Sequence, residues 1–431
     1  MRWGLAVSLL GSEASTPDRE FAAPSVDRPG VIRPADRASD LLRLGYPARR
    51  EAEHTEIEAS NGVRVTIPES SPMSNSWSGG QYSLVRAILG VYLLVRFAAL
   101  LSFDAEVASS TAMAILGVAA SLALLIGSHD RAAAWVVTVL WMSLFLRAPL
   151  VDHSGPLIVG FVVLLHASTP PRPFGSWQAR GRVDPDSGWR MPPLIYLAAW
   201  IVMILGVVER GIAASGLPSQ VGPSLLAAAL FITGLVVWKT LRPGAWLGLL
   251  GTQFVLANFG DDMNLNAGLM LLQLFTFDPG WIRPRLPEHQ TDQDPTLVFY
   301  DGTCGLCHRT IRFLLAEDAA GLRFRYATLD SDAFRSALRE PESGFRPGDA
   351  LPDSVVVHRP GTAMLTRASG ALEIGHQLGG LWRLLAIVAG WIPISVLNHG
   401  YDFIARVRHR LFRRPDESCP LVPAELRDRF E

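Results

Sequence analysis

Long apolar runs separate a polar N-terminal segment from a C-terminal section of mixed texture. Five runs, at 83–103, 107–127, 132–151, 192–213 and 223–241, are poor in charge and close to the roughly 20 residues that a membrane-spanning helix needs. Three shorter runs lie at 155–168, 245–259 and 267–277. The pattern predicts an α-helical membrane bundle of about eight spans over residues 81–282. A soluble helical bundle would carry more charge along runs of this length.

The N-terminal segment has no sustained hydrophobic period. Residues 1–80 are rich in Arg, Asp, Glu, Ser and Pro, a composition that cannot bury much apolar surface. The opening "MRWGLAVSLL" resembles a signal peptide, but its apolar core is at the short limit. We therefore predict a disordered N-terminal tail. The stretch that begins at Met73 also reads as a natural start of translation.

The charges of the loops between the apolar runs predict an orientation. With the N-terminus inside and eight spans, nine basic residues fall on inner loops and two, Arg147 and Arg210, on outer loops. Basic residues favour the cytoplasmic side of a membrane. An even number of spans then returns the chain to the cytoplasm before residue 296. The loss of one short span would place the C-terminal section on the other side.

A polar linker, residues 283–295, precedes a section with the pattern of a soluble α/β domain. "TLVFY" (296–300) is typical of a buried strand, and 307–318 has the apolar spacing of an amphipathic helix. Residues 322–329 alternate as a strand does, and 331–340 begin with a serine suited to cap a helix. Two strands, 354–359 and 363–367, flank a Pro-Gly turn and precede a helical tail. This order predicts a thioredoxin-like α/β domain over 296–431.

Composition limits the classes of function. The chain has 431 residues, a net charge of −1, 49% hydrophobic residues and 18% charged residues. This balance favours a membrane protein and provides no long-range field to attract nucleic acid. Three cysteines are too few for a secreted disulfide framework of this length. The oligomeric state cannot be read from the sequence.

Two of the three cysteines form a CxxC motif between the first predicted strand and the first predicted helix of the α/β domain. Free N–H groups and the positive end of the helix dipole stabilise a thiolate at such a position. We predict that Cys304 is the attacking thiolate and that Cys307 resolves the mixed disulfide. His308 and Arg309 could lower the pKa of Cys304 further. Asp301 would either relay a proton through water or fix the turn.

Other interpretations of this pair remain open. A zinc site would need two more ligands, from Cys419 or from a histidine such as His308, His358 or His376, and the chain has no second CxxC. The pair could also be inert. Cys419 itself lies in "ESCPLVP", where it reads as a tail thiol or as a third redox cysteine.

The C-terminal section resembles the DCC family of thiol-disulfide oxidoreductases, which is named for a D-x-x-C-x-x-C motif. The motif corresponds here to Asp301, Cys304 and Cys307 within "YDGTCGLC", and "YDFIARVRHRLF" (401–412) resembles the closing helix of the family. The resemblance implies a thioredoxin-like fold and dithiol chemistry without a cofactor, but not a substrate. Thioredoxin-like proteins also place a cis-proline opposite the CxxC, and Pro352 is the candidate.

The apolar section resembles, less specifically, the horizontally transferred transmembrane domain related to vitamin-K-dependent γ-carboxylase. "VRAILGVYLLVR" and "NLNAGLMLLQLFTFDPGWI" carry this resemblance, and a DoxX-like bundle competes with it. The carboxylase's catalytic lysine has no visible counterpart. Arg96, inside the first run, would either pair with a backbone carbonyl or line a quinone, lipid or anion pocket.

The sequence thus predicts a multi-pass protein of a bacterial inner membrane that presents a cytoplasmic thiol-disulfide oxidoreductase domain. Its expected partners are the lipid bilayer and a thiol or disulfide substrate, either a protein or a small thiol, and not a nucleic acid. The alternative is a transporter or a quinone- or lipid-binding membrane protein with a regulatory redox domain.

Overall fold

The computed structural model describes residues 54–58, 64–68, 75–103, 108–145, 154–215, 221–257, 263–285, 295–345, 354–359, 361–412 and 422–431. The chain forms two compact units, residues 1–69 and residues 70–431. Pro352 and Cys419 lie outside the described residues, as do residues 1–53. The predictions made for Pro352 and Cys419 therefore stay predictions.

The first unit contains a short antiparallel hairpin. Strands β1 (His54–Glu58) and β2 (Arg64–Pro68) pair with Ile57 opposite Val65 and Thr55 opposite Ile67. β-branched residues occur in both strands, alternating with other residues in β1 and consecutive in β2, and they favour extended structure. The structure differs here from the disordered tail predicted for residues 1–80.

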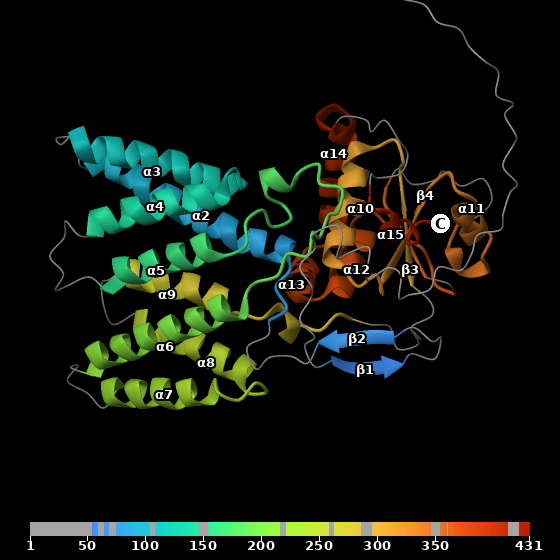
Figure 1. Ribbon diagram of the computed structural model, residues 1–431. Helices are drawn as coiled ribbons and strands as arrows, with labels where there is room; N and C mark the ends of the chain where they lie inside the picture. The colour runs from blue at the N-terminus through green and yellow to red at the C-terminus, as the bar shows by residue number, and fades with distance from the viewer. Residues whose placement is uncertain are drawn as a thin grey trace, which may run out of the picture. The chain divides into compact units, whose positions relative to one another are not determined.

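The second unit begins with eight helices in the region predicted to form the bundle, counted over its described residues. Figure 1 shows the helices with their labels. They are α2 (Gly79–Phe103), α3 (Ala108–Ile126), α4 (Asp130–Phe145), α5 (Ser154–Ser168), α6 (Pro193–Ser215), α7 (Val221–Leu235), α8 (Arg242–Leu256) and α9 (Met263–Thr276). Each predicted apolar run is thus a helix.

The structure does not support the predicted number of about eight membrane spans. In the described part of the chain, two helices are long and apolar enough to cross a bilayer, at Gly79–Leu101 and Pro193–Ile212. A third span results if the bent pair Gly380–Ala389 and Ile394–Arg408 is taken as one. Shorter helices such as α9, with 14 residues, extend only about 21 Å at about 1.5 Å per residue, against a hydrocarbon thickness of about 30 Å.

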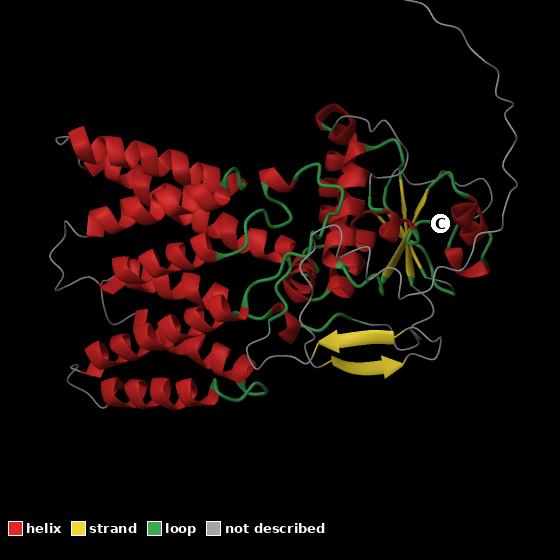
Figure 2. Ribbon diagram, viewed as in Figure 1, coloured by secondary structure: helices red, strands yellow, loops and turns green. Residues whose placement is uncertain are grey.

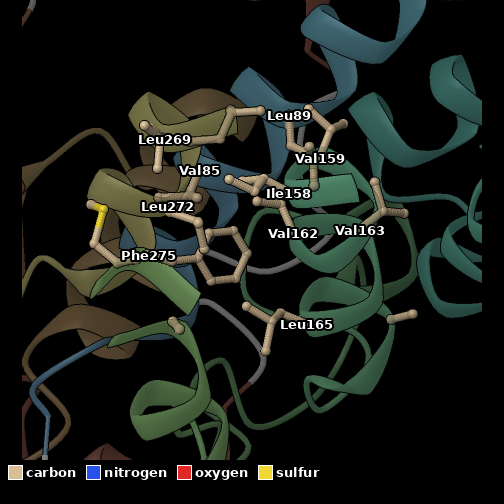
Figure 3. Close-up of a cluster of buried hydrophobic side chains, with 14 of the residues drawn as sticks. Val85, Leu89, Ile158, Val159, Val162, Val163, Leu165, Leu269, Leu272 and Phe275 are labelled. Atoms are coloured by element: carbon tan, nitrogen blue, oxygen red, sulfur yellow. The ribbon is translucent and has the colours of Figure 1, made fainter. Parts of the chain in front are cut away.

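Branched and aromatic side chains from distant segments form the core of the bundle. Figure 3 shows Val85 and Leu89 of α2 close to side chains of α5 and α9, among them Val159, Val162 and Phe275. Gly90 allows α2 to approach α3 closely, because a Cβ at this position would lie 2.7 Å from the Leu125 Cα. The core therefore depends on apolar packing between helices far apart in the sequence.

A four-stranded mixed sheet follows, with strands shown in yellow in Figure 2. Its strands are β3 (Thr296–Tyr300), β4 (Phe324–Thr328), β5 (Val356–His358) and β6 (Leu365–Thr366). Their order is β4-β3-β5-β6, with β3 parallel to β4 and antiparallel to β5. Strand β3 is central, which explains its unbroken apolar sequence.

Helices cover both faces of this sheet. Val298 and Tyr300 of β3 pack toward α10 (Gly305–Glu317) and α12 (Arg367–Leu378), whereas Phe299 packs on α11 (Asp332–Leu338). Figure 1 shows α10 and α12 on one side of the strands and α11 on the other. The predicted order of strand, CxxC, helix, strand, helix, hairpin and helix is confirmed. The predicted Ser331 cap is also present, since its hydroxyl accepts the Phe334 N–H at 3.2 Å.

The predicted helical tail consists of three further helices in its described part. They are α13 (Gly380–Ala389), α14 (Ile394–Leu411) and the short α15 (Ala424–Arg427). Helix α14 packs against α10 and α12, and α13 packs against α12 and α2. Large apolar side chains remain exposed on this pair of helices and on the turn between them, including Trp391, Val396 and Phe403.

A half-buried carboxylate joins α10 to the first helix of the bundle. Glu317, the last residue of α10, accepts hydrogen bonds from the Ser78 hydroxyl at 2.6 Å, the Gly80 N–H at 3.1 Å and the Trp382 indole N–H at 2.5 Å. The Gly80 N–H belongs to the first turn of α2, where backbone donors lack helical partners. Burial raises the pKa of Glu317, although the hydrogen bonds that it accepts act in the opposite direction.

Glu317→Ala should destabilise the folded protein, because it leaves three donors without an acceptor in a half-buried site. The expected loss is about 3 kcal/mol of unfolding free energy. For a chain of 431 residues that corresponds to a fall of about 3 °C in Tm. Thermal unfolding of the full chain in detergent measures this change. Glu342→Ala, at an exposed position, is the control, and equal Tm values for the two variants would contradict the assignment.

Candidate functional site: the Cys304–Cys307 dithiol

The dithiol lies where the central strand ends and the helix on its face begins. Strand β3 ends at Tyr300, the turn 301–303 follows, and Cys304 is the N-cap residue of α10 with extended backbone angles. Its Sγ accepts the backbone N–H of Cys307 at 3.4 Å. Both cysteines are free thiols, and both are buried, with 1% of Cys304 and 3% of Cys307 exposed.

Hydrogen bonds hold the turn before Cys304 in place. The Asp301 carboxylate accepts the Thr303 N–H and the Thr303 hydroxyl, both at 2.8 Å, and the Asp301 carbonyl accepts the Cys304 N–H at 3.2 Å. The His308 Nε2 lies 2.9 Å from the Gly302 carbonyl oxygen, and His308 is itself buried. Two roles were considered for Asp301, and its hydrogen bonds to Thr303 correspond to the one in which it fixes the turn.

The two thiols have opposite acidities. A hydrogen bond from the Cys307 thiol lowers the pKa of Cys304 to about 6, against the opposing effect of burial. The Cys307 N–H and the positive charge of Arg408 lower it further. The same hydrogen bond, together with burial, raises the pKa of Cys307. These two shifts favour the state of the pair in which Cys304 carries the negative charge and Cys307 keeps the proton.

The cation at the site comes from the C-terminal helix and was not predicted. Arg408 of α14 has only 3% of its side chain exposed, and its Nη2 lies 3.5 Å from the Asp301 Oδ2. Arginines are rarely buried without a charged partner. The segment 401–412, which resembles the family's closing helix, contains Arg408, and this resemblance was the available signal that the helix lies near the dithiol. The partner of Arg408, 107 residues away in the sequence, could not be identified from spacing.

The other predicted site residues lie in different surroundings. The Arg309 guanidinium lies over the ring of Phe412, 4.7 Å from its centroid. Arg96 is half-buried on α2, and its Nε has no hydrogen-bond partner. The proposed function of Arg96 in a quinone, lipid or anion pocket is not tested and stays a prediction. Among the described residues no group of three or more His, Cys, Asp or Glu side chains could hold a metal ion.

A small apolar cavity lies beside the resolving cysteine. Its volume is about 180 Å³, and α10, α12 and α14 contribute most of its lining. Cys307, Val355, Tyr401 and Arg408 all border it. The Tyr401 hydroxyl accepts the Val355 N–H at 3.0 Å, which ties α14 to the residue just before β5. Helix α14 thus covers the side of the dithiol that faces this cavity.

Comparison with known proteins now assigns the family. Residues 298–414 match the DCC1-like thiol-disulfide oxidoreductase family. The chain is also 31% identical over 141 residues to the uncharacterized protein YuxK of Bacillus subtilis (strain 168), covering 32% of this chain and 97% of YuxK. Through its C-terminal domain, the chain belongs to the DCC1-like family. No solved structure shows significant similarity to the chain.

The DCC1-like match indicates a redox function and thiol-disulfide oxidoreductase activity. It includes all three residues of the D-x-x-C-x-x-C motif and extends through Arg408. The resemblance of residues 83–282 to the γ-carboxylase-related transmembrane domain is not shown by these comparisons.

Alkylation should reveal the low pKa of Cys304. In a Cys419→Ser background, the rate of reaction of Cys304 with iodoacetamide should rise with pH to a midpoint near 6, because the thiolate is the nucleophile. The unfolded chain should show a midpoint near 8.5. Arg408→Gln should move the midpoint of the folded protein upward by removing a nearby positive charge. Mass spectrometry of the alkylated peptide gives the rate at each pH.

Arg406→Gln is the matched control for this measurement, because Arg406 is exposed on the same helix and donates to the Asp402 carbonyl. It should leave the midpoint unchanged. Equal midpoints for Arg408→Gln and the parent protein would exclude Arg408 as a source of the low pKa.

Proposed function

We propose that the protein is a membrane-tethered thiol-disulfide oxidoreductase that uses Cys304 and Cys307 as a dithiol on a cytoplasmic, thioredoxin-like domain. The observation that carries the proposal is the free thiol pair at the start of α10, in which the pKa of Cys304 is lowered and that of Cys307 is raised. The DCC1-like match over these residues supports the same chemistry.

The two thiols act in sequence. The Cys304 thiolate attacks one sulfur of a substrate disulfide, forming a mixed disulfide and releasing the first substrate thiolate. Cys307 then gives up its proton and attacks the Cys304 sulfur, forming the Cys304–Cys307 bond and releasing the second thiolate. The substrate gains two electrons and the dithiol loses two. A cellular thiol reductant of low potential restores the dithiol by the reverse exchange.

Asp301 and Arg408 act as positioning residues in this scheme. Asp301 fixes the turn before Cys304 and pairs with Arg408, whose charge favours the thiolate. The substrate is a protein disulfide or a small-molecule disulfide, and no metal or organic cofactor takes part in the exchange.

The apolar surface of the helical region supports membrane tethering. Large side chains that a water-soluble bundle would bury are exposed along α2 and α6, among them Val95 (61%), Leu194 (75%) and Leu205 (63%). The cytoplasmic position proposed for the dithiol domain rests on the eight-span interpretation of the sequence, in which nine basic residues fall on inner loops and two on outer loops. In the reducing cytoplasm, at roughly −220 mV or below, such a dithiol rests reduced and acts as a reductant.

A redox titration tests the chemistry. The full chain with Cys419→Ser, equilibrated in detergent with glutathione buffers of roughly −150 to −320 mV, should pass from two free thiols to a Cys304–Cys307 disulfide. Mass spectrometry after acid quenching identifies the bond. Cys307→Ser should instead accumulate a mixed disulfide between Cys304 and glutathione, because no resolving thiol remains. Absence of the intramolecular bond across the whole series would refute the proposed activity.

Labelling of intact cells tests the orientation. Because Cys304 and Cys307 are buried, the reporter is Ser336→Cys, at an exposed position of α11, in a chain whose three cysteines are replaced by serine. An impermeant maleimide should label this residue only after the membrane is permeabilised. Labelling of intact cells would place the domain outside the cytoplasm and would favour the opposite role, that of an oxidant or isomerase.

A further inference from the structure

A second, larger cavity lies on another face of α10. It has a volume of about 560 Å³ and is lined by residues 174–176 and 179–183, from the loop between α5 and α6, and by residues of α10. Four of its twelve lining residues are arginines, namely Arg180, Arg182, Arg309 and Arg312. His308 also lines the cavity. None of the described residues that line it is acidic. The size is within the usual range of small-molecule sites.

Contacts other than ion pairs position the arginines from the loop. The Arg180 guanidinium lies 3.8 Å from the ring centroid of Trp177. Arg182 donates to the Ser187 hydroxyl and to the Arg172 carbonyl, and the Arg182 carbonyl in turn accepts from Arg312. Because the Ser187 hydroxyl and the Arg172 carbonyl are neutral, their hydrogen bonds fix the Arg182 guanidinium group without cancelling its charge.

The electrostatic setting of the cavity is positive. Burial is the main cause that lowers the pKa of both Arg182 and Arg312, and the neighbouring charge of Arg172 lowers that of Arg182 as well. The negative charge of Asp184 raises the pKa of both arginines, and that of Asp130 raises the pKa of Arg182. Asp130 itself accepts the backbone N–H groups of Arg131 and Arg172. Concentrating arginines in one cavity costs free energy, which a bound anion would offset.

We infer that this cavity binds a phosphate group carried by an organic molecule. Guanidinium groups bind phosphate oxygens in pairs of parallel hydrogen bonds, and several guanidinium groups converge here from two separate segments. Phe174 and Phe313, with ring centroids 6.2 Å apart, provide an apolar wall for the organic part of the ligand. Two sources share this chemistry, an anionic phospholipid headgroup and a soluble phosphate ester.

The site is adjacent to the dithiol along α10 but is distinct from it. Cys304, His308 and Arg312 follow one another at intervals of four residues, so they lie on one face of the helix. The apolar cavity beside Cys307 is bordered by a different set of α10 residues, Leu306 and Thr310 among them. The inference concerns binding and does not depend on the proposed redox reaction.

Two binding measurements on the full chain in a neutral detergent separate the sources. The first titrates inorganic phosphate by calorimetry. The second reconstitutes the protein in nanodiscs of phosphatidylcholine with or without phosphatidylglycerol and counts retained lipid by native mass spectrometry. Arg180→Gln/Arg312→Gln should weaken binding by about 10-fold or more, because each charged hydrogen-bond pair contributes about 1.5–3 kcal/mol. Arg335→Gln, on exposed α11, should leave binding unchanged.

The single variant Arg180→Gln guards against a folding artefact, since Arg180 is exposed and stacks on the exposed Trp177. It should weaken binding by a smaller factor than the double variant, without lowering Tm. Loss of phosphate binding in these variants supports a soluble ligand, and selective loss of retained phosphatidylglycerol supports a lipid headgroup. Binding of neither probe by the parent protein, or equal binding by parent and both variants, overturns the inference.

Discussion

The hydrogen bond from the Cys307 N–H to the Cys304 Sγ determines how the rest of the site is organised. The first N–H groups of a helix have no partner within it, and here a sulfur atom takes the place of the usual capping oxygen. For this to happen, the strand before the helix must end at one fixed place. Strand β3 is held in the middle of the sheet by β4 and β5, so the position of Tyr300 is set by packing. The Asp301 turn then delivers Cys304 to the start of α10.

Local patterns predicted the elements around the dithiol well. The apolar run 296–300 coincides with β3, and Ser331 caps α11 as expected, because both signals depend on neighbours in the sequence. Arg408 was missed because its partner Asp301 is brought to it only by the packing of α14 on α10. The eight helices were found, but not their capacity to span a bilayer, since an apolar run does not reveal where a helix ends. Helix α7, for example, ends at Leu235 within a run that continues to 241.

A second capping interaction lies at the other end of α10. There, Glu317 of α10 caps the start of another helix, α2. Glu317 accepts a backbone N–H from the first turn of α2 and the indole N–H of α13. A carboxylate in this position is favoured by the dipole of α2 and disfavoured by its burial. The raised pKa of Glu317 indicates that burial is the larger effect. Thirteen residues of one helix therefore connect the dithiol, the start of the bundle and the apolar α13–α14 pair.

The burial of both sulfurs constrains how any substrate can react. Thiol-disulfide exchange requires a third sulfur to approach Cys304 directly, yet only 1% of this residue is exposed. An element that covers the dithiol must therefore move when a substrate enters. Helix α14 borders the cavity beside Cys307 and is held there by Tyr401 and by the pairing of Arg408 with Asp301. Access and reactivity thus make opposite demands on the site: a substrate needs the covering element to move, whereas the low pKa of Cys304 depends on the positive charge of Arg408 staying near it.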